Sequence, residues 1–124
     1  MPYGQTEAAL EAASNSWSVD LKDTGVTCNV LVPGGATNTR LIPEESPYDR
    51  DALIQPDVMI QPIIWLMSDL SDGVNGQRFV GRYWAADADW QTGSAASGAP
   101  IAWPELAAQA AQGGQPKPKG GYNI

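Results

Sequence analysis

One short segment constrains the fold of this chain more than any other. Residues 26–32 are Val-Thr-Cys-Asn-Val-Leu-Val, a run rich in β-branched side chains that predicts a buried strand. A buried strand needs a neighbour on each side, and the sequence offers only one further strand-like segment, residues 77–84. We therefore expect the chain to form the end of a larger sheet.

Two helices are predicted beside these strands. Residues 4–23 are rich in Ala and Leu and end at Thr24-Gly25. Residues 56–69 form the second, with Pro56 in its first turn and Pro62 as a weak point. The expected apolar stripe of the first helix comprises Leu10, Ala13, Trp17 and Leu21. The expected apolar face of the second comprises Met59, Ile63, Leu66 and Met67, widened by Ile60, Ile64 and Trp65.

The order helix, strand, helix, strand is typical of α/β domains, in which two strands joined through a helix run parallel. We predict an α/β fold class, the C-terminal part of a doubly wound parallel sheet with about two strands and two main helices. Residues 1–90 would be this partial domain, with a loop and short helical pieces over 36–54. Residues 91–124, rich in Gly, Pro, Ala and Gln, are expected to be a largely irregular tail, disordered over its last twelve residues.

Composition excludes several classes of function. The 124 residues carry 7 Lys+Arg and 14 Asp+Glu, a net charge of −7 that argues against binding nucleic acid or an anionic membrane. Because there is no histidine, Ser-His-Asp catalysis, Cys-His catalysis and imidazole zinc sites are excluded. The single Cys28 cannot form an internal disulfide. With no signal sequence and no membrane-spanning apolar run, we expect a cytoplasmic protein.

Three segments together resemble the C-terminal half of the short-chain dehydrogenase/reductase family. They are Pro-Tyr-Gly-Gln-Thr-Glu-Ala-Ala-Leu-Glu at 2–11, Thr-Gly-Val-Thr-Cys-Asn-Val-Leu-Val-Pro-Gly-Gly-Ala-Thr-Asn-Thr at 24–39 and Gly-Val-Asn-Gly-Gln-Arg-Phe-Val-Gly at 73–81. The resemblance runs from residue 2 to about residue 90 and depends on the order and spacing of the segments. It implies a Rossmann-type fold, NAD or NADP as cofactor, and hydride transfer to or from an alcohol or carbonyl carbon.

The resemblance also implies site residues. Tyr3 matches the family's catalytic tyrosine, but Glu7 stands where the family has a lysine. Tyrosine alone has a pKa of about 10, and a nearby cation favours its phenolate. Glu7 lies one helical turn from Tyr3, so its carboxylate should oppose that ionisation. The loop after the first strand is expected to meet the nicotinamide side of the cofactor through Pro33, Gly34, Gly35, Ala36, Thr37 and Thr39.

The family's glycine-rich dinucleotide loop and catalytic serine belong to its N-terminal half, and neither is recognisable in this sequence. We therefore expect a truncated oxidoreductase fragment that is inactive alone and does not bind the cofactor alone. The alternative is a non-catalytic oligomerisation subunit, whose first helix pairs with a second copy or with a full-length or complementary relative. A gene fragment without a selected function is the third interpretation. The substrate and the choice between NAD and NADP are not determined by these residues.

Other side chains have simpler interpretations. Cys28 is predicted to be a small core residue, and the tryptophans Trp17 and Trp65 are predicted to pack. The carboxylates of the 36–54 loop are expected to be solvated rather than metal-binding: Glu44, Glu45, Asp49 and Asp51. Lys117 and Lys119 are expected to be exposed in the tail.

Overall fold

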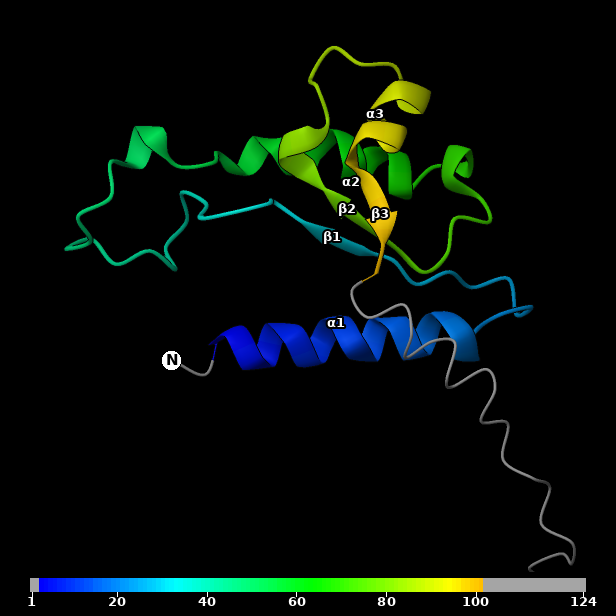
Figure 1. The fold of residues 1–124 in the computed structure, drawn as a ribbon. Coiled ribbons are helices and arrows are strands. Elements are labelled where there is room, and N and C mark those ends of the chain that lie inside the picture. The colour runs from blue at the N-terminus through cyan, green and yellow to red at the C-terminus, as the bar shows by residue number, and fades with distance from the viewer. Residues whose placement is uncertain (1–2, 102–124) are drawn as a thin grey trace, which may run out of the picture.

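The structure, a computed structural model, describes residues 3–101. Of Tyr3 it describes the backbone but not the side chain. The main elements are α1 (Tyr3–Asp20), β1 (Val30–Val32), α2 (Ile60–Leu66), β2 (Gln77–Val80), α3 (Trp90–Ser97) and β3 (Gly98–Pro100). Four 3-10 helices join them: η1 (Arg50–Ala52), η2 (Pro56–Met59), η3 (Asp69–Ser71) and η4 (Gly81–Tyr83). Figure 1 shows α1 along one side of the sheet and α2 and α3 on the other.

The sheet has three strands in the order β1-β2-β3 and is mixed. β1 and β2 run parallel with Leu31 opposite Phe79, as the helix that connects them predicts. β2 and β3 run antiparallel, with Arg78 opposite Ala99. The predicted α/β class and the parallel pairing of the two predicted strands are confirmed, and a third strand and a third helix are added.

β1 is shorter and less buried than predicted. Only Val30–Val32 form the strand, and all three residues are half-buried. Side-chain amides take over the pairing just before it: Asn75 Oδ1 accepts from the Cys28 N–H (2.9 Å), and Asn29 Oδ1 accepts from the Gln77 N–H (3.1 Å). These asparagines satisfy backbone donors without a regular ladder, which explains why the strand begins late. β2 likewise ends at Val80, because the chain tightens into η4.

The packing face of α1 corrects the predicted stripe. Leu10 is 56% exposed and Trp17 is 49% exposed, whereas the small polar residues Ser14, Asn15 and Ser18 are buried. Small side chains let the helix approach the chain entering β2 closely: the Asn75 side-chain amide donates to the Ser18 carbonyl (2.7 Å). The two serines satisfy their own hydroxyls within the helix, so their burial leaves no unpaired donor. Helical periodicity identified the helix but not its buried face.

The second helix also buries a different face than expected. It begins as the 3-10 helix η2 and becomes α-helical at Ile60, which places Pro62 in the first turn of α2, where its missing N–H is not needed. Pro62 and Trp65 are buried, while Ile60, Ile63, Ile64 and Met67 are exposed. The expected apolar face therefore holds for Trp65 and in part for the half-buried Met59 and Leu66, and it fails for these four residues.

Residues 90–101 correct the expectation of an irregular tail after residue 90. Asp89 caps α3 by accepting hydrogen bonds from the Thr92 N–H (2.8 Å) and hydroxyl (3.1 Å). β3 is Gly-Ala-Pro, which has almost no intrinsic strand propensity and pairs only because β2 offers an edge. Ile101 follows and is buried. The rest of the predicted tail, including Lys117 and Lys119, lies outside the described residues.

Three aromatic side chains form the centre of the core between the sheet and α2. The ring of Trp65 lies 5.3 Å from that of Phe79 and 5.7 Å from that of Trp84, at tilted or edge-on angles that aromatic pairs favour. Gly93 of α3 packs directly on the Trp84 indole, where a Cβ would collide with the ring. The core therefore depends on α3 as well as on the predicted elements.

Candidate functional site

The candidate site lies where β1 ends. Pro33-Gly34-Gly35 turns the chain out of the sheet, and Gly34 has φ +101°, a conformation that favours glycine. The Arg82 N–H donates to the Pro33 carbonyl (3.1 Å), and Arg82 Nη1 donates to the Gly34 carbonyl (3.3 Å). This turn therefore sits at the carboxyl ends of both parallel strands, the edge at which open α/β sheets bind ligands.

The loop after this turn is closed by bonds to its own chain. The Thr37 hydroxyl donates to the Gly35 carbonyl (2.9 Å). The Ile54 N–H donates to the Ala36 carbonyl (3.1 Å), and the Asn38 N–H donates to the Ile54 carbonyl (2.8 Å). These bonds hold residues 36–38 beside Ile54, so several groups expected to meet a cofactor are engaged within the protein.

Arg50 organises the next part of the loop, a role that the sequence did not predict. Its Nη1 donates to Asn38 Oδ1 (3.1 Å) and to the Thr39 carbonyl (3.0 Å), and its Nη2 donates to the Ile42 carbonyl (2.6 Å). A surface hollow of about 470 Å³ lies beside it, lined by Arg40, Ile42, Pro43, Glu44 and Arg50. An arginine in a polar loop gives no periodic signal, so only the folded loop reveals this role.

Tyr3 is the first residue of α1, and its side chain is outside the described part. Figure 1 shows that the amino end of α1 and the segment after β1 lie toward the same end of the molecule. Glu7 is exposed on α1 and lines a hollow of about 360 Å³ between α1 and β1. The structure thus places the two predicted parts of the site at one end.

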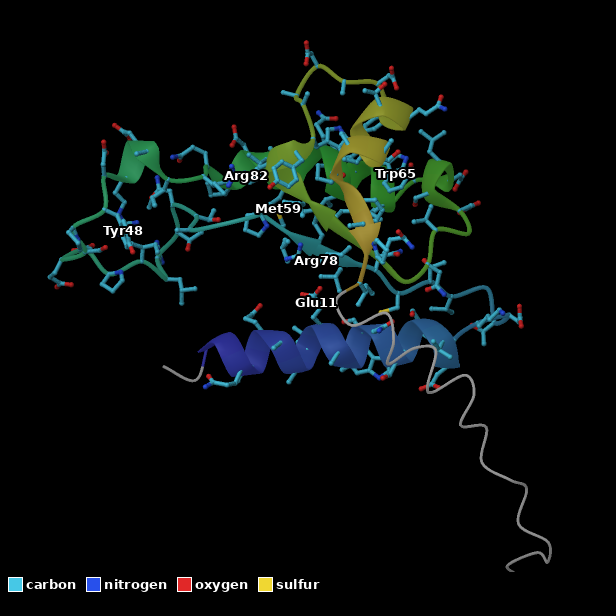
Figure 2. All side chains as sticks on the ribbon, in the orientation of Figure 1. Glu11, Tyr48, Met59, Trp65, Arg78 and Arg82 are labelled. Carbon is cyan, nitrogen blue, oxygen red and sulfur yellow. The ribbon has the colours of Figure 1, made fainter. Side chains whose placement is uncertain are left out.

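An ion pair lines that hollow. Arg78 Nε on β2 lies 3.0 Å from Glu11 Oε1 on α1 (Figure 2). The pair ties the helix to the sheet, and Glu7, one turn earlier on α1, lines the same hollow. Two carboxylates therefore border this hollow, and Glu11 is the one that pairs with Arg78.

The described residues do not fit a dinucleotide by themselves. Val80 and the Arg82 stem fill the space beside Gly34: a Cβ added there would lie 2.5 Å from Val80 Cγ1 and 2.6 Å from Arg82 Cδ. This glycine therefore serves the protein's own packing. None of residues 33–39 lines the hollow beside Arg50, the hollow beside Gly73 or the hollow between α1 and β1, although Val32 lines the last of these. Gly73 and Gly76 precede a strand rather than a helix, so they build no phosphate cradle.

Other candidate residues have structural roles or solvent contact. Cys28 is only half-buried and does not belong to the core, which corrects its prediction as a small core residue. The four loop carboxylates Glu44, Glu45, Asp49 and Asp51 are exposed, as expected. Asp49 caps η1 by accepting from the Asp51 N–H (3.0 Å). Between residues 3 and 101 there is no cluster of carboxylates and cysteine that could hold a metal ion, and no helix long and apolar enough to cross a membrane.

Comparison with known proteins adds no family to this description. No protein-family model matches the chain, and no curated protein or solved structure matches it either.

Proposed function

We propose that this chain is the C-terminal half of a Rossmann-type domain of the short-chain dehydrogenase/reductase kind, a cytoplasmic NAD(P)-dependent oxidoreductase fragment that is inactive alone. One observation carries the proposal. β1 pairs with β2 on one side, and within residues 3–101 no strand pairs with its other edge. A parallel strand with an open edge, flanked by α1 and by the β1–β2 crossover, is what the end of a doubly wound sheet presents.

The arrangement at the end of β1 supports the same proposal. The start of α1 and the Pro33–Thr39 loop share one end of the molecule, as a tyrosine and a nicotinamide-side loop would require. The complementary chain would supply the dinucleotide phosphate site, whose donors come from a glycine-rich turn and a helix amino end. The resident loop and Tyr3 would then complete the site.

Co-expression with the N-terminal half of a short-chain dehydrogenase/reductase tests this proposal. We expect a stable two-chain complex that binds NADH or NADPH and has weak oxidoreductase activity. Glu7→Lys in the complex should raise the rate at least about tenfold, or roughly 1.4 kcal/mol of barrier, because a cation replaces a carboxylate beside Tyr3. Asp20→Lys, the same charge change at the far end of α1, is the matched control and should leave the rate unchanged.

Two results would contradict the proposal in different ways. If the two halves do not associate, the half-domain interpretation fails. If they associate and bind cofactor but the parent and Glu7→Lys complexes turn over equally fast, the fold is supported and the electrostatic role of residue 7 is wrong.

The second candidate function is a non-catalytic subunit that pairs through its first helix. Leu10 and Trp17 favour it, because both are large apolar side chains left exposed on α1. Titration of the full chain against a full-length relative tests it. Binding that is lost in Leu10→Ser and Trp17→Ser variants would support this function, and binding that both variants retain would exclude α1 as the contact.

A further inference from the structure

The turn that enters β2 contains the one Asn-Gly pair of the sequence, Asn75-Gly76. Both residues are half-buried, so water reaches them. Gly76 has φ +68° and no side chain, so nothing on its Cα hinders the approach of another group to its backbone nitrogen. Of all positions in this chain, the pair is the best suited to attack of a main-chain nitrogen on a side-chain amide.

The reaction that this pair supports is an intramolecular deamidation. The Gly76 nitrogen attacks Asn75 Cγ, the Cγ–Nδ2 bond breaks, and ammonia leaves with the proton of the Gly76 N–H. Water then opens the succinimide ring and leaves either aspartate at position 75 or an isoaspartyl linkage, in which the main chain runs through the former side chain. Water is the only co-reactant, and no atom is oxidised or reduced.

In the folded chain, hydrogen bonds hold both reacting groups. The Gly76 N–H donates to the Cys28 carbonyl (3.0 Å), and Asn75 Oδ1 accepts from the Cys28 N–H (2.9 Å). Asn75 Nδ2 donates to the Ser18 carbonyl on α1 (2.7 Å). The attack requires the Gly76 nitrogen to lose its proton and Cγ to turn toward it, so these bonds must break first. The amide is therefore protected until the structure opens locally.

α1 covers this turn directly. Besides the bond from Asn75, Ser18 Oγ lies 3.1 Å from the place that a Cβ on Gly76 would take. The ion pair between Glu11 and Arg78 joins the same helix to the sheet (3.0 Å). Undocking of α1 removes the bond from Asn75 Nδ2 and uncovers Gly76, so the amide becomes free to turn.

The product does not restore the contact. Aspartate at position 75 has no donor, so its carboxylate would face the Ser18 carbonyl where a hydrogen bond now spans 2.7 Å. An isoaspartyl linkage lengthens the main chain immediately before β2 begins at Gln77. Either product disfavours the return of α1 to the sheet.

We propose that Asn75-Gly76 is a deamidation site controlled by the docking of α1, and that its deamidation is a one-way switch that keeps α1 undocked. The site precedes β2, whereas the Pro33–Thr39 loop follows β1 at the opposite ends of the parallel strands. The proposal therefore does not depend on the proposed function.

Peptide mapping by mass spectrometry of the full chain, incubated in mildly alkaline buffer, tests the control by folding. We expect conversion of the Asn75 amide to a carboxyl group to be at least about tenfold slower in native buffer than in concentrated urea, because only opened chains react. Equal rates in the two conditions would overturn the proposal.

A matched pair of variants tests the part played by α1. Glu11→Gln removes the ion pair with Arg78 and should speed deamidation in native buffer at least about threefold, with the rate in urea unchanged. Glu7→Gln is the control, the same change one turn earlier at a residue that pairs with no cation among residues 3–101, and should leave both rates unchanged. Equal rates for the two variants in native buffer would overturn the control by α1.

Asn75→Asp gives one product of the reaction directly. Hydrogen exchange of the α1 amides should be faster in this variant than in the parent, while the amides of Gln77–Val80 stay protected. Asn38→Asp, the same change in the loop after β1, is the control and should leave exchange in α1 unchanged. Slow exchange of α1 in Asn75→Asp, or fast exchange throughout the sheet as well, would overturn the switch.

Discussion

Gly34 shows how one residue determines the course of the chain at the candidate site. Its positive φ turns the chain out of β1, and the absence of a Cβ lets Val80 and Arg82 pack against the turn. Arg82 then holds the carbonyls of Pro33 and Gly34. From the sequence, these glycines were expected to let a cofactor approach. The structure gives Gly34 a packing role inside the protein.

We predict that Gly34→Ala lowers the free energy of unfolding by at least about 2 kcal/mol, since it adds backbone strain and a steric clash. Gly73→Ala is the matched control: Gly73 also has positive φ (78°), but a Cβ there meets nothing within 4 Å. Urea denaturation of both variants separates the two causes. Equal losses would show that packing around Gly34 is unimportant.

At the scale of elements, side chains set where the helices begin and how they dock. Asp89 caps α3, and hydrogen bonds from the backbone N–H and the hydroxyl of Thr92 hold the pKa of the Asp89 carboxyl below its usual value of 3.8. Arg78 and Glu11 join β2 to α1. The periodicity of the sequence alone predicts neither the start of α3 nor the docking of α1 on the sheet.

The Asp89 cap predicts a pH dependence. A carboxyl whose pKa is lower in the folded state contributes stability above its unfolded pKa, and this contribution is lost as the pH falls through the folded pKa. Asp89→Ala should therefore lower the Tm at pH 6, and its difference from the parent should shrink as the pH falls below about 3.8. Asp87→Ala, an exposed aspartate two residues earlier, is the control and should have little effect. A Tm difference for Asp89→Ala that is independent of pH would contradict the charged cap.

The ion pair between α1 and β2 predicts a second effect. Arg78→Met keeps the apolar stem and leaves the largely buried Glu11 carboxylate without its cation, so stability should fall by about 1 to 2 kcal/mol. Arg40→Met is the control, because Arg40 is exposed and pairs with no carboxylate among residues 3–101. The measurement is chemical denaturation, and similar losses in the two variants would mean that the pair contributes nothing specific.

At the scale of the whole molecule, the dominant feature is the edge of β1 that no strand of residues 3–101 pairs with. β2 is paired on both sides and lies against the aromatic core, whereas β1 is half-buried and paired once. Edge strands expose backbone groups and open more readily than central strands. Stability is therefore expected to be uneven across this small sheet.

Hydrogen exchange measures this unevenness. In the isolated chain the amides of Gln77–Val80 should exchange more slowly than those of Val30–Val32. Association with a complementary half should slow the β1 amides most, because a new strand would pair with them. Slow exchange at β1 in a chain that remains monomeric would mean that its edge is already covered, and the half-domain proposal would have to be abandoned.

The isolated chain should bind neither NADH nor NADPH, because the described residues hold no phosphate cradle. Isothermal titration calorimetry is the measurement, with the two-chain complex as the positive control. A dissociation constant in the low micromolar range for the chain alone would contradict this expectation.

Local signals in the sequence were sufficient for part of this description. The Ala- and Leu-rich run gave α1, the β-branched run and the Gly-Gln-Arg-Phe-Val segment gave β1 and β2, and the helix between them gave their parallel pairing. Pro33-Gly34-Gly35 gave the turn. These features depend on neighbouring residues, so periodicity and turn chemistry can predict them.

Only the tertiary structure decided which faces are buried. α1 packs through Ser14, Asn15 and Ser18 because close approach to the sheet needs small side chains, and Leu10 and Trp17 are left outside. β3 forms from Gly-Ala-Pro because β2 has an edge to pair, and Arg50 organises the loop because folding brings its acceptors together. Burial, edge pairing and loop clamping depend on residues far apart in the sequence, and no local pattern contains that information.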